Sequence, residues 1–353
     1  MVDRKHERQS NLELLRIVAM VMIICCHFAT YNDFGPTNIF STKILGLSML
    51  RLGGKTGVIL FVMVTGYFMI SKPFKWKRIM DLSRQTIFFS IVMALLAFVT
   101  EGIRPGVVGV LKIVFPLLLE NYWFLTDFAL ILLLSPILNK LVHHNDKRLL
   151  FYGLVVAIGF TGLPIVTPDM KNNLIGLAIA YVLGAYIHTG NIKLSNLRLL
   201  SGMVTVLMTT TVITGVLIAT SRFSHTAFQY RLFFVTGFNI SAFCVAFLMF
   251  LAFEKWKFGN ASIINLVAST TFGVYLFHDS RVFRNIMWHK IINPTEWHGT
   301  NLLFGFILTI VSIFGFGMMM DFVRQFMFRI CSEIVAYIKK QFRSTSINDR
   351  DIN

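Results

Sequence analysis

Leu12 to Tyr31 read LELLRIVAMVMIICCHFATY, an apolar run that is interrupted by three ionisable side chains, Glu13, Arg16 and His27. A helix rises about 1.5 Å per residue, so about 20 apolar residues cross the hydrocarbon core of a bilayer. A charged tail precedes the run, as in a signal peptide, but the run carries two charges and lacks a cleavage site of small residues. We therefore expect a retained membrane-spanning helix.

The composition of the whole chain agrees with this interpretation. Of 353 residues, 55% are hydrophobic and 14% are charged, whereas soluble domains carry about 25% charged residues. Such a chain cannot cover itself with polar surface, which argues against a large soluble enzyme. We predict an all-α, polytopic, multi-pass protein of the cell (plasma or inner) membrane with about ten transmembrane helices. The expected spans lie near residues 12–31, 53–70, 85–100, 121–141, 149–167, 172–188, 199–220, 232–253, 263–279 and 301–323.

The distribution of basic residues predicts the orientation. Lys and Arg favour one set of alternate connections by about two to one, which places both termini in the cytoplasm. The net charge of +16 arises from 33 Lys and Arg against 17 Asp and Glu. These basic residues are dispersed among apolar segments, which indicates topology signals and contact with an anionic lipid bilayer rather than nucleic acid.

Two further segments complete the predicted organisation. The stretch 106–119 is apolar but short, so we expect it to be re-entrant or interfacial. From 324 to 343 apolar residues recur at four-residue spacing among basic ones, which is typical of a helix lying flat on the inner leaflet. We therefore predict a transmembrane domain over 1–323 and a cytoplasmic amphipathic tail over 324–353.

The cysteines give no sign of a metal site. Cys25, Cys26, Cys244 and Cys331 do not have the spacing of a zinc site or of a disulfide framework. We expect them to be small apolar fillers inside helices, and we expect no metal.

The first span carries the strongest candidates for chemistry. Arg16 and His27 are separated by about 16 Å along a helix and differ by roughly 20° in azimuth, so they line one face. Histidine suits general-base work and arginine suits the binding of phosphate. The alternative is structural: Arg16 anchors the helix at the inner leaflet, and His27 makes a hydrogen bond between helices.

A basic turn follows the second span. It reads Lys72-Pro-Phe-Lys75-Trp-Lys77-Arg78, with Arg84 beyond it. Such a cluster could cradle the phosphates of a nucleotide-like donor, or it could simply mark the cytoplasmic side.

Several blocks of the chain resemble acyltransferase family 3. The run from Asn11 to His27, in which ten residues separate Arg16 from the histidine, is similar to the family's opening signature. The segments GVILFVMVTGY (57–67), YWFL (122–125) with SPILN (135–139), and FGVYLFH (272–278) resemble its second, mid-chain and penultimate helices. The blocks occur in family order from residue 11 to residue 278, so the resemblance covers most of the chain.

The resemblance implies transfer of an acyl group, usually acetyl, from cytoplasmic acyl-CoA to a sugar hydroxyl of a surface polysaccharide or lipid-linked glycan. His27 would be the catalytic histidine, and Arg16 would lie near the donor. The family often has an Arg-x-x-Arg pair after its second helix. Here Asp81 stands three positions after Arg78, so Lys75, Arg78 and Arg84 are the residues that we expect to bind acetyl-CoA. Glycan-synthesis machinery is a possible partner, and the acyl group could be succinyl instead.

The remaining site residues have competing explanations. A carboxylate could orient the His27 imidazole. Asp127, Asp33 and Asp279 are the candidates, and we favour Asp127 because it lies within a span. Tyr67, Trp123 and His278 are expected to contact the acceptor. Trp123 could equally belong to an interfacial aromatic belt, and His278 could be a structural hydrogen-bonding group.

Two functions without catalysis stay open. A transporter or exporter of a glycan or of a lipid-linked glycan precursor would also need many helices and charges inside the membrane. Transporters often contain repeats and interrupted helices at corresponding places, and no such repeat is evident. A structural subunit of an envelope-synthesis complex would tolerate changes at Arg16 and His27.

Overall fold

The computed structural model describes residues 9–35, 41–144, 146–163, 173–190, 192 and 194–348, with side chains described to residue 338. Within these ranges the chain is helical and has no strand, as an all-α membrane protein requires. The helices are α1 (Ser10–Tyr31), α2 (Thr42–Met69), α3 (Trp76–Glu101), α4 (Val107–Val114), α5 (Trp123–His144), α6 (Lys147–Gly162), α7 (Asn173–Thr189), α8 (Asn196–Thr220), α9 (His225–Tyr230), η1 (Phe233–Val235), α10 (Ile240–Lys255), α11 (Ser262–Ala268), α12 (Thr271–His278), η2 (Ile286–Ile291) and α13 (Gly299–Asn348).

Seven of the described helical segments are long and apolar enough to cross a membrane. They include α1, α2, α3, α5 and α8, together with the segment His225–Lys255 and the first part of α13. The predicted spans 172–188 and 263–279 correspond to shorter apolar segments, Asn173–Thr189 and Ser262–His278. The span predicted over 149–167 begins as α6, and its end lies outside the described residues. The chain is thus an all-α polytopic membrane protein, while the count of ten spans stays a prediction.

Two helices begin earlier than the apolar runs predict. The side chain of Ser41 accepts a hydrogen bond from the Ile44 amide and so caps α2 eleven residues before the apolar run at 53. Lys43 and Arg51 lie inside this helix, and their charges obscured its first three turns in the sequence. Helix α3 likewise begins within the basic turn, at Trp76, and ends at Gly102, whose φ of 64° is a left-handed helix stop.

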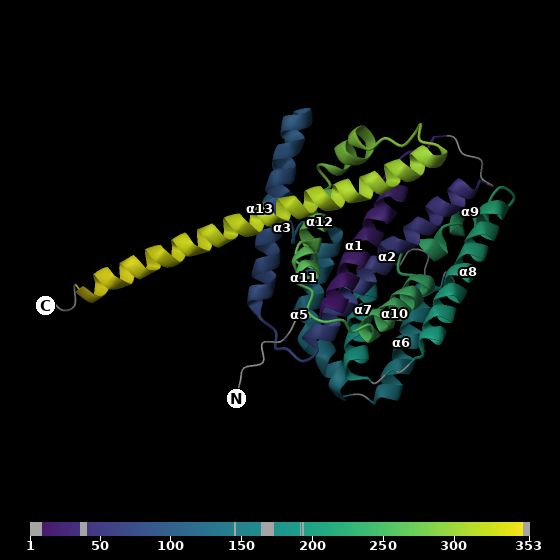
Figure 1. Cartoon of the computed structure of the whole chain (residues 1–353), viewed down its shortest axis with the longest axis horizontal. Coiled ribbons are helices and arrows are strands. Elements are labelled where there is room, and N and C mark those ends of the chain that lie inside the picture. Colours follow the sequence, from purple (N-terminus) through teal and green to yellow (C-terminus); the bar gives the residue numbers. More distant parts are fainter. Residues whose placement is uncertain are drawn as a thin grey trace.

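Helices α1 and α2 form the centre of the bundle (Figure 1). Gly53, Gly54 and Gly57 of α2 lie directly against α1, where a Cβ atom would overlap atoms of Met22, Cys26 and Ala19. On its other side α2 packs against α7 in the same way. There Gly66 meets the backbone of Tyr181, and Gly184 meets the backbone of Met63. Small residues allow this close backbone contact in membrane helix pairs, where packing rather than water exclusion drives association.

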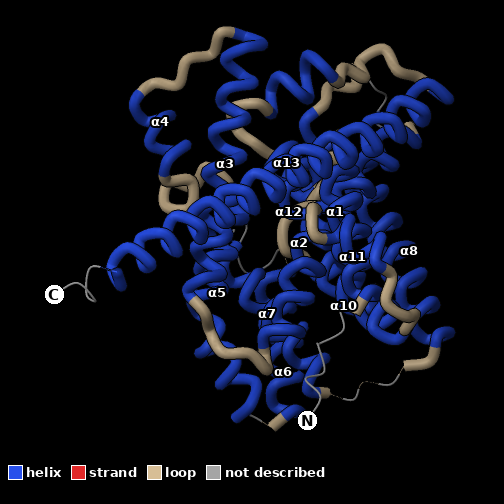
Figure 2. Tube along the Cα trace, turned by 60° about the vertical axis from the view of Figure 1, so that its left-hand side comes forward, coloured by secondary structure: helices blue, strands red, loops and turns tan. Residues whose placement is uncertain are grey.

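The peripheral helices are mostly exposed to lipid. Helix α4, within the stretch predicted to be re-entrant or interfacial, is a short helix at the margin of the bundle (Figure 2). Helix α13 crosses the bundle and then projects beyond it (Figure 1). It continues without a break past residue 323, so the predicted tail extends the last helix instead of starting a new element. Residues 1–8 and 349–353, the ends of the two predicted domains, lie outside the described residues.

Replacing Gly184 by alanine should destabilise the bundle. The added methyl would overlap the Met63 carbonyl oxygen, which is backbone and cannot rotate away. Overpacking of this kind lowers the free energy of unfolding by about 1–3 kcal/mol. Thermal unfolding in detergent measures the loss. The matched control is Gly159→Ala on α6, where a Cβ has open space and where alanine should be neutral or slightly stabilising. Equal stability of the two variants would contradict this packing.

Candidate active site

His27 lines a partly open cavity of about 340 Å³. The cavity lies where the last turns of α1 face the middle of α2. Trp123 of α5 and Tyr275 of α12 contribute aromatic walls, and Asn173 and Thr236 contribute polar ones. His27 and Trp123, both predicted to belong to the site, therefore face the same space.

A second imidazole lies beside His27. The ring centroids of His27 and His278 are 5.0 Å apart, and the Tyr31 ring lies 4.9 Å from His27 on another side. His278 is fully buried, and its Nδ1 lies 2.6 Å from the Val274 carbonyl oxygen. A carbonyl only accepts, so His278 Nδ1 carries the proton and Nε2 keeps its lone pair.

Each of these imidazoles has a buried nitrogen that lacks a hydrogen-bond partner in the described part of the chain: Nδ1 of His27 and Nε2 of His278. Buried polar atoms are nearly always satisfied, so unsatisfied ones call for an explanation. Two of them on adjacent rings beside a cavity are suited to a ligand that carries a hydroxyl.

A buried carboxylate connects to this pair through Tyr31. The hydroxyl of Tyr275 donates to Asp279 Oδ2 over 2.8 Å, and that of Tyr31 donates to Oδ1 over 3.3 Å. Arg284 pairs with the same Oδ1 at 3.6 Å and donates to the Tyr31 hydroxyl over 3.1 Å. Asp279 thereby fixes Tyr31, whose ring packs on His27.

Asp127, predicted to orient His27, interacts electrostatically with Lys55 at the cavity but does not line the cavity itself. It sits one turn beyond Trp123 on α5 and is half-buried. Asp33 accepts a hydrogen bond from the Gly35 amide in the exposed loop after α1. Of the three carboxylates considered from the sequence, Asp279 is therefore the one that hydrogen bonds join to the residues around His27.

Arg16 and His27 both face α2, as their spacing predicts. Arg16 lies over the Phe61 ring of α2 at 4.9 Å and pairs with Glu13 at 3.2 Å. It lies eleven positions before His27, about 16 Å along the helix. Arg16 is not one of the residues lining the His27 cavity, so the structure leaves its predicted place near the donor untested.

The predicted donor-binding residues surround the start of α3. Arg84 and Lys77 both pair with Asp81, at 2.5 and 2.8 Å. Arg78 instead donates to the Pro73 carbonyl oxygen over 3.2 Å. Lys75 immediately precedes the helix and is exposed. The cluster is thus an exposed basic surface whose one acidic member, Asp81, already holds two of the cations.

Tyr67 lies near the C-terminal end of α2, beyond the His27 cavity. Its ring packs on His188 at 4.7 Å and on Phe250 at 5.5 Å. Val58, which lines the cavity, precedes it by nine residues, about 14 Å of helix. The structure therefore brings Trp123 and His278 together with His27 but places Tyr67 apart.

Two cations at the cavity were missed as site residues. Arg51 and Lys55 of α2 line it, yet the sequence suggested only a role in topology. The sequence does contain a sign of their shared location. Arg51 and Lys55 are four positions apart, so in a helix both side chains lie on one face.

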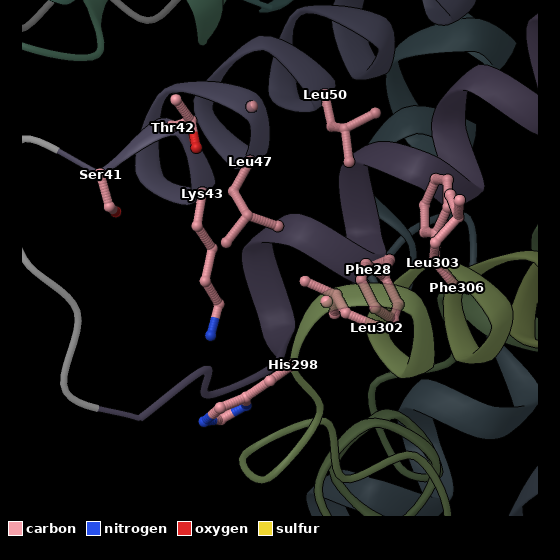
Figure 3. Close-up of a pocket in the computed structure, with 12 residues that line it drawn as sticks. Phe28, Ser41, Thr42, Lys43, Leu47, Leu50, His298, Leu302, Leu303 and Phe306 are labelled. Carbon is pink, nitrogen blue, oxygen red and sulfur yellow. The ribbon is translucent and has the colours of Figure 1, made fainter.

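A larger cavity of about 770 Å³ lies on the other side of the α1 terminus (Figure 3). Leu47, Leu302 and Phe306 form most of its wall, and Lys43 and His298 lie at one end. Phe28 lines this cavity while its neighbour His27 lines the smaller one. The end of α1 therefore separates two cavities, and each has a mainly apolar lining.

Comparison with known proteins identifies one family. Residues 9–320 match the family model described as an acyltransferase domain, which covers nearly the whole chain. This match confirms the family resemblance of the sequence blocks. Searches of curated proteins and of solved structures found no match.

Removing the Tyr31 hydroxyl should weaken the bundle while keeping the ring beside His27. Tyr31→Phe deprives the buried Asp279 of a donor and Arg284 of an acceptor, which costs about 1–3 kcal/mol of unfolding free energy. Chemical unfolding in detergent measures this loss. Tyr152→Phe is the control, because Tyr152 is 65% exposed and its change should stay within about 0.5 kcal/mol. Similar effects from both variants would rule out a structural role for the network.

Proposed function

The chain belongs to the acyltransferase family whose domain model matches residues 9–320, and we propose that this membrane acyltransferase acylates a cell-surface glycan. In this proposal the acyl group, typically acetyl, moves from cytoplasmic acyl-CoA to a hydroxyl of an envelope or extracellular polysaccharide. The observation that carries the proposal is the His27 imidazole, which lines a cavity and has a buried nitrogen without a partner in the described structure.

The reaction requires a base for the acceptor alcohol. His27 removes the hydroxyl proton as the oxygen attacks the thioester carbonyl, which avoids a free alkoxide in a low-dielectric space. A C–O bond forms, the C–S bond breaks, and the departing sulfur of coenzyme A receives the proton from the imidazolium. The products are an ester and free coenzyme A.

The neighbours of His27 have distinct tasks in this scheme. His278 offers the lone pair of Nε2 to a neighbouring hydroxyl of the acceptor sugar, and Trp123 provides a flat apolar face for a sugar ring. Asp279 is a positioning residue, because it acts on His27 only through Tyr31. Asp127 keeps no role in this scheme.

The donor binds at the opposite end of the first helix pair. Coenzyme A carries several phosphates, and guanidinium groups bind phosphate with paired hydrogen bonds. Lys75 and Arg78 lie on the basic surface at the start of α3, and Arg16 lies in the first turns of α1, at the same end of the α1–α2 pair. These three residues are our candidates for holding the donor. The predicted topology places this end on the cytoplasmic side, where acyl-CoA is available.

One feature is also expected of a transporter. The apolar segment Ser262–His278 is interrupted after Ala268, and interrupted helices form substrate sites in transporters. Here the second piece, α12, carries His278 and Tyr275 to the His27 cavity. The family match favours the use of this break for catalysis.

Changing His27 to alanine should abolish acylation without preventing membrane insertion. Loss of a general base lowers the rate by about 10²–10⁴-fold. O-acyl signals in NMR spectra of the purified surface polysaccharide, compared among null, wild-type and variant cells, provide the measurement. The control is His298→Ala, which removes an imidazole from the larger cavity instead. Full acyl content in the His27→Ala cells would exclude a catalytic His27.

Reversing the charge of Arg78 should weaken donor binding selectively. Loss of a hydrogen bond to a charged group costs about 1.5–3 kcal/mol, so Arg78→Glu should raise KM for acyl-CoA by about tenfold or more. KM for the acceptor should change little. The control, Arg148→Glu, alters an exposed arginine at the start of α6. Equal weakening of donor and acceptor binding would point to misfolding and remove the support for a donor site at α3.

A further inference from the structure

A groove of about 500 Å³ lies between α8 and α10, which pack side by side (Figure 1). Its lining includes Asn196, the first residue of α8, and Lys255, the last residue of α10. The two helices therefore run in opposite directions, and the groove begins at the end that they share. Small-molecule sites span about 300–1,000 Å³, so the groove has room for part of one ligand.

The lining divides into a polar end and an apolar length. Asn196, Lys255 and Trp256 form the polar end. The other lining residues are all apolar and come from both helices: Leu199, Leu200, Met203, Leu248 and Ala252. From Asn196 to Met203 the chain advances about 10 Å along α8, roughly a third of the hydrocarbon core of a bilayer. A molecule with a polar head and a hydrocarbon chain matches this division.

The polar end of the groove is cationic. Lys255 Nζ donates to the Leu194 carbonyl oxygen over 3.2 Å, which holds the ammonium group beside the start of α8. None of the described residues that line the groove carries a carboxylate, and the neighbouring Glu254 pairs with Lys257 at 3.8 Å. The start of α8 adds the positive end of a helix dipole. This end of the groove therefore suits an anionic head group.

The position of the groove indicates where its ligand comes from. The predicted topology places the polar end at the cytoplasmic surface, and Trp256, which is 58% exposed, is a residue type that concentrates at the membrane interface. Leu200 is 63% exposed, so the apolar length is open to the bilayer. The cytoplasmic leaflet carries anionic lipids, and basic pockets between transmembrane helices on that side bind their head groups. The positive-inside rule explains a lysine at this end but not a groove beside it.

We propose that this groove binds one anionic phospholipid of the cytoplasmic leaflet, with its phosphate head group at Lys255 and one acyl chain between α8 and α10. The groove shares no lining residue with the His27 cavity, so the proposal does not rest on the acylation reaction. The lipid stabilises the end of α10, where the Phe253 carbonyl oxygen accepts a hydrogen bond from Asn11 of α1 over 2.8 Å. It thereby supports the start of the helix that carries His27.

The test compares two lipids that differ in head-group charge. The full-length protein in detergent is titrated with phosphatidylglycerol, which is anionic, or with phosphatidylcholine of the same acyl chains, which is zwitterionic. The increase in Tm reports binding to the folded state, and native mass spectrometry gives the Kd of the bound lipid. We expect phosphatidylglycerol to raise the Tm at lower concentrations than phosphatidylcholine does.

Variants connect this selectivity to the groove. Lys255→Gln should raise the Kd for phosphatidylglycerol by about fivefold, equivalent to about 1 kcal/mol, whereas Lys255→Arg should retain binding. The matched control is Lys257→Gln, which removes a nearby lysine that does not line the groove and should leave the Kd unchanged. Ala252→Phe fills the apolar length and should abolish selective binding. If its Tm without lipid shows loss of folding, Leu200→Trp fills the groove from an exposed position instead.

Three results would overturn the proposal. Equal Kd values for the two lipids would mean that the groove holds ordinary boundary lipid. An unchanged Kd in folded Lys255→Gln protein would assign the selectivity to another basic surface, such as the turn before α3. A change of oligomeric mass in the groove-filling variants, with selective binding of phosphatidylglycerol retained, would make the groove a contact between copies of the chain.

Discussion

The backbone contact between α1 and α2 is the constraint on which the site depends. Gly53, Gly54 and Gly57 let α1 approach so closely that a methyl group at any of them would meet α1 atoms. This approach sets His27 opposite Arg51 and Lys55 in one small cavity. Larger residues at these glycines would separate the helices, and the imidazole would then face a wider and less defined space.

A second contact fixes α12, which carries the other half of the site. Gly273 lies against the side chain of Asp321 on α13, where a Cβ would overlap it. Asp321 is completely buried, and it accepts hydrogen bonds from Arg324 at 2.7 Å and from Gln85 at 2.9 Å. This satisfied polar cluster joins α3, α12 and α13, and it holds α12 where His278 meets His27. Hydrogen bonds among buried polar groups favour one arrangement of helices, because any shift leaves a charge unpaired.

The sequence predicted the parts of this arrangement that follow from local patterns. The lengths of the apolar runs predicted the helices. Helical periodicity placed Arg16 and His27 on a common face, and in the structure this face turns toward α2. Charges misled the prediction for α2, because the predicted span 53–70 starts after Lys43 and Arg51 although the helix already includes both residues. Contacts between distant segments could not be predicted from periodicity. Asp279 is the last residue of the predicted span 263–279, and only folding brings it to Tyr31, 248 positions away in the chain.

The geometry of the first helix pair restricts the form of the donor. If phosphates are held near Arg16 and Arg78 while acyl transfer occurs at His27, the charged part and the reactive carbonyl are separated by about 16 Å of helix. A compact acyl phosphate would be too short to satisfy both ends. A donor with a charged nucleotide head and a long, thin, neutral arm that ends in a thioester satisfies both, and coenzyme A has this shape.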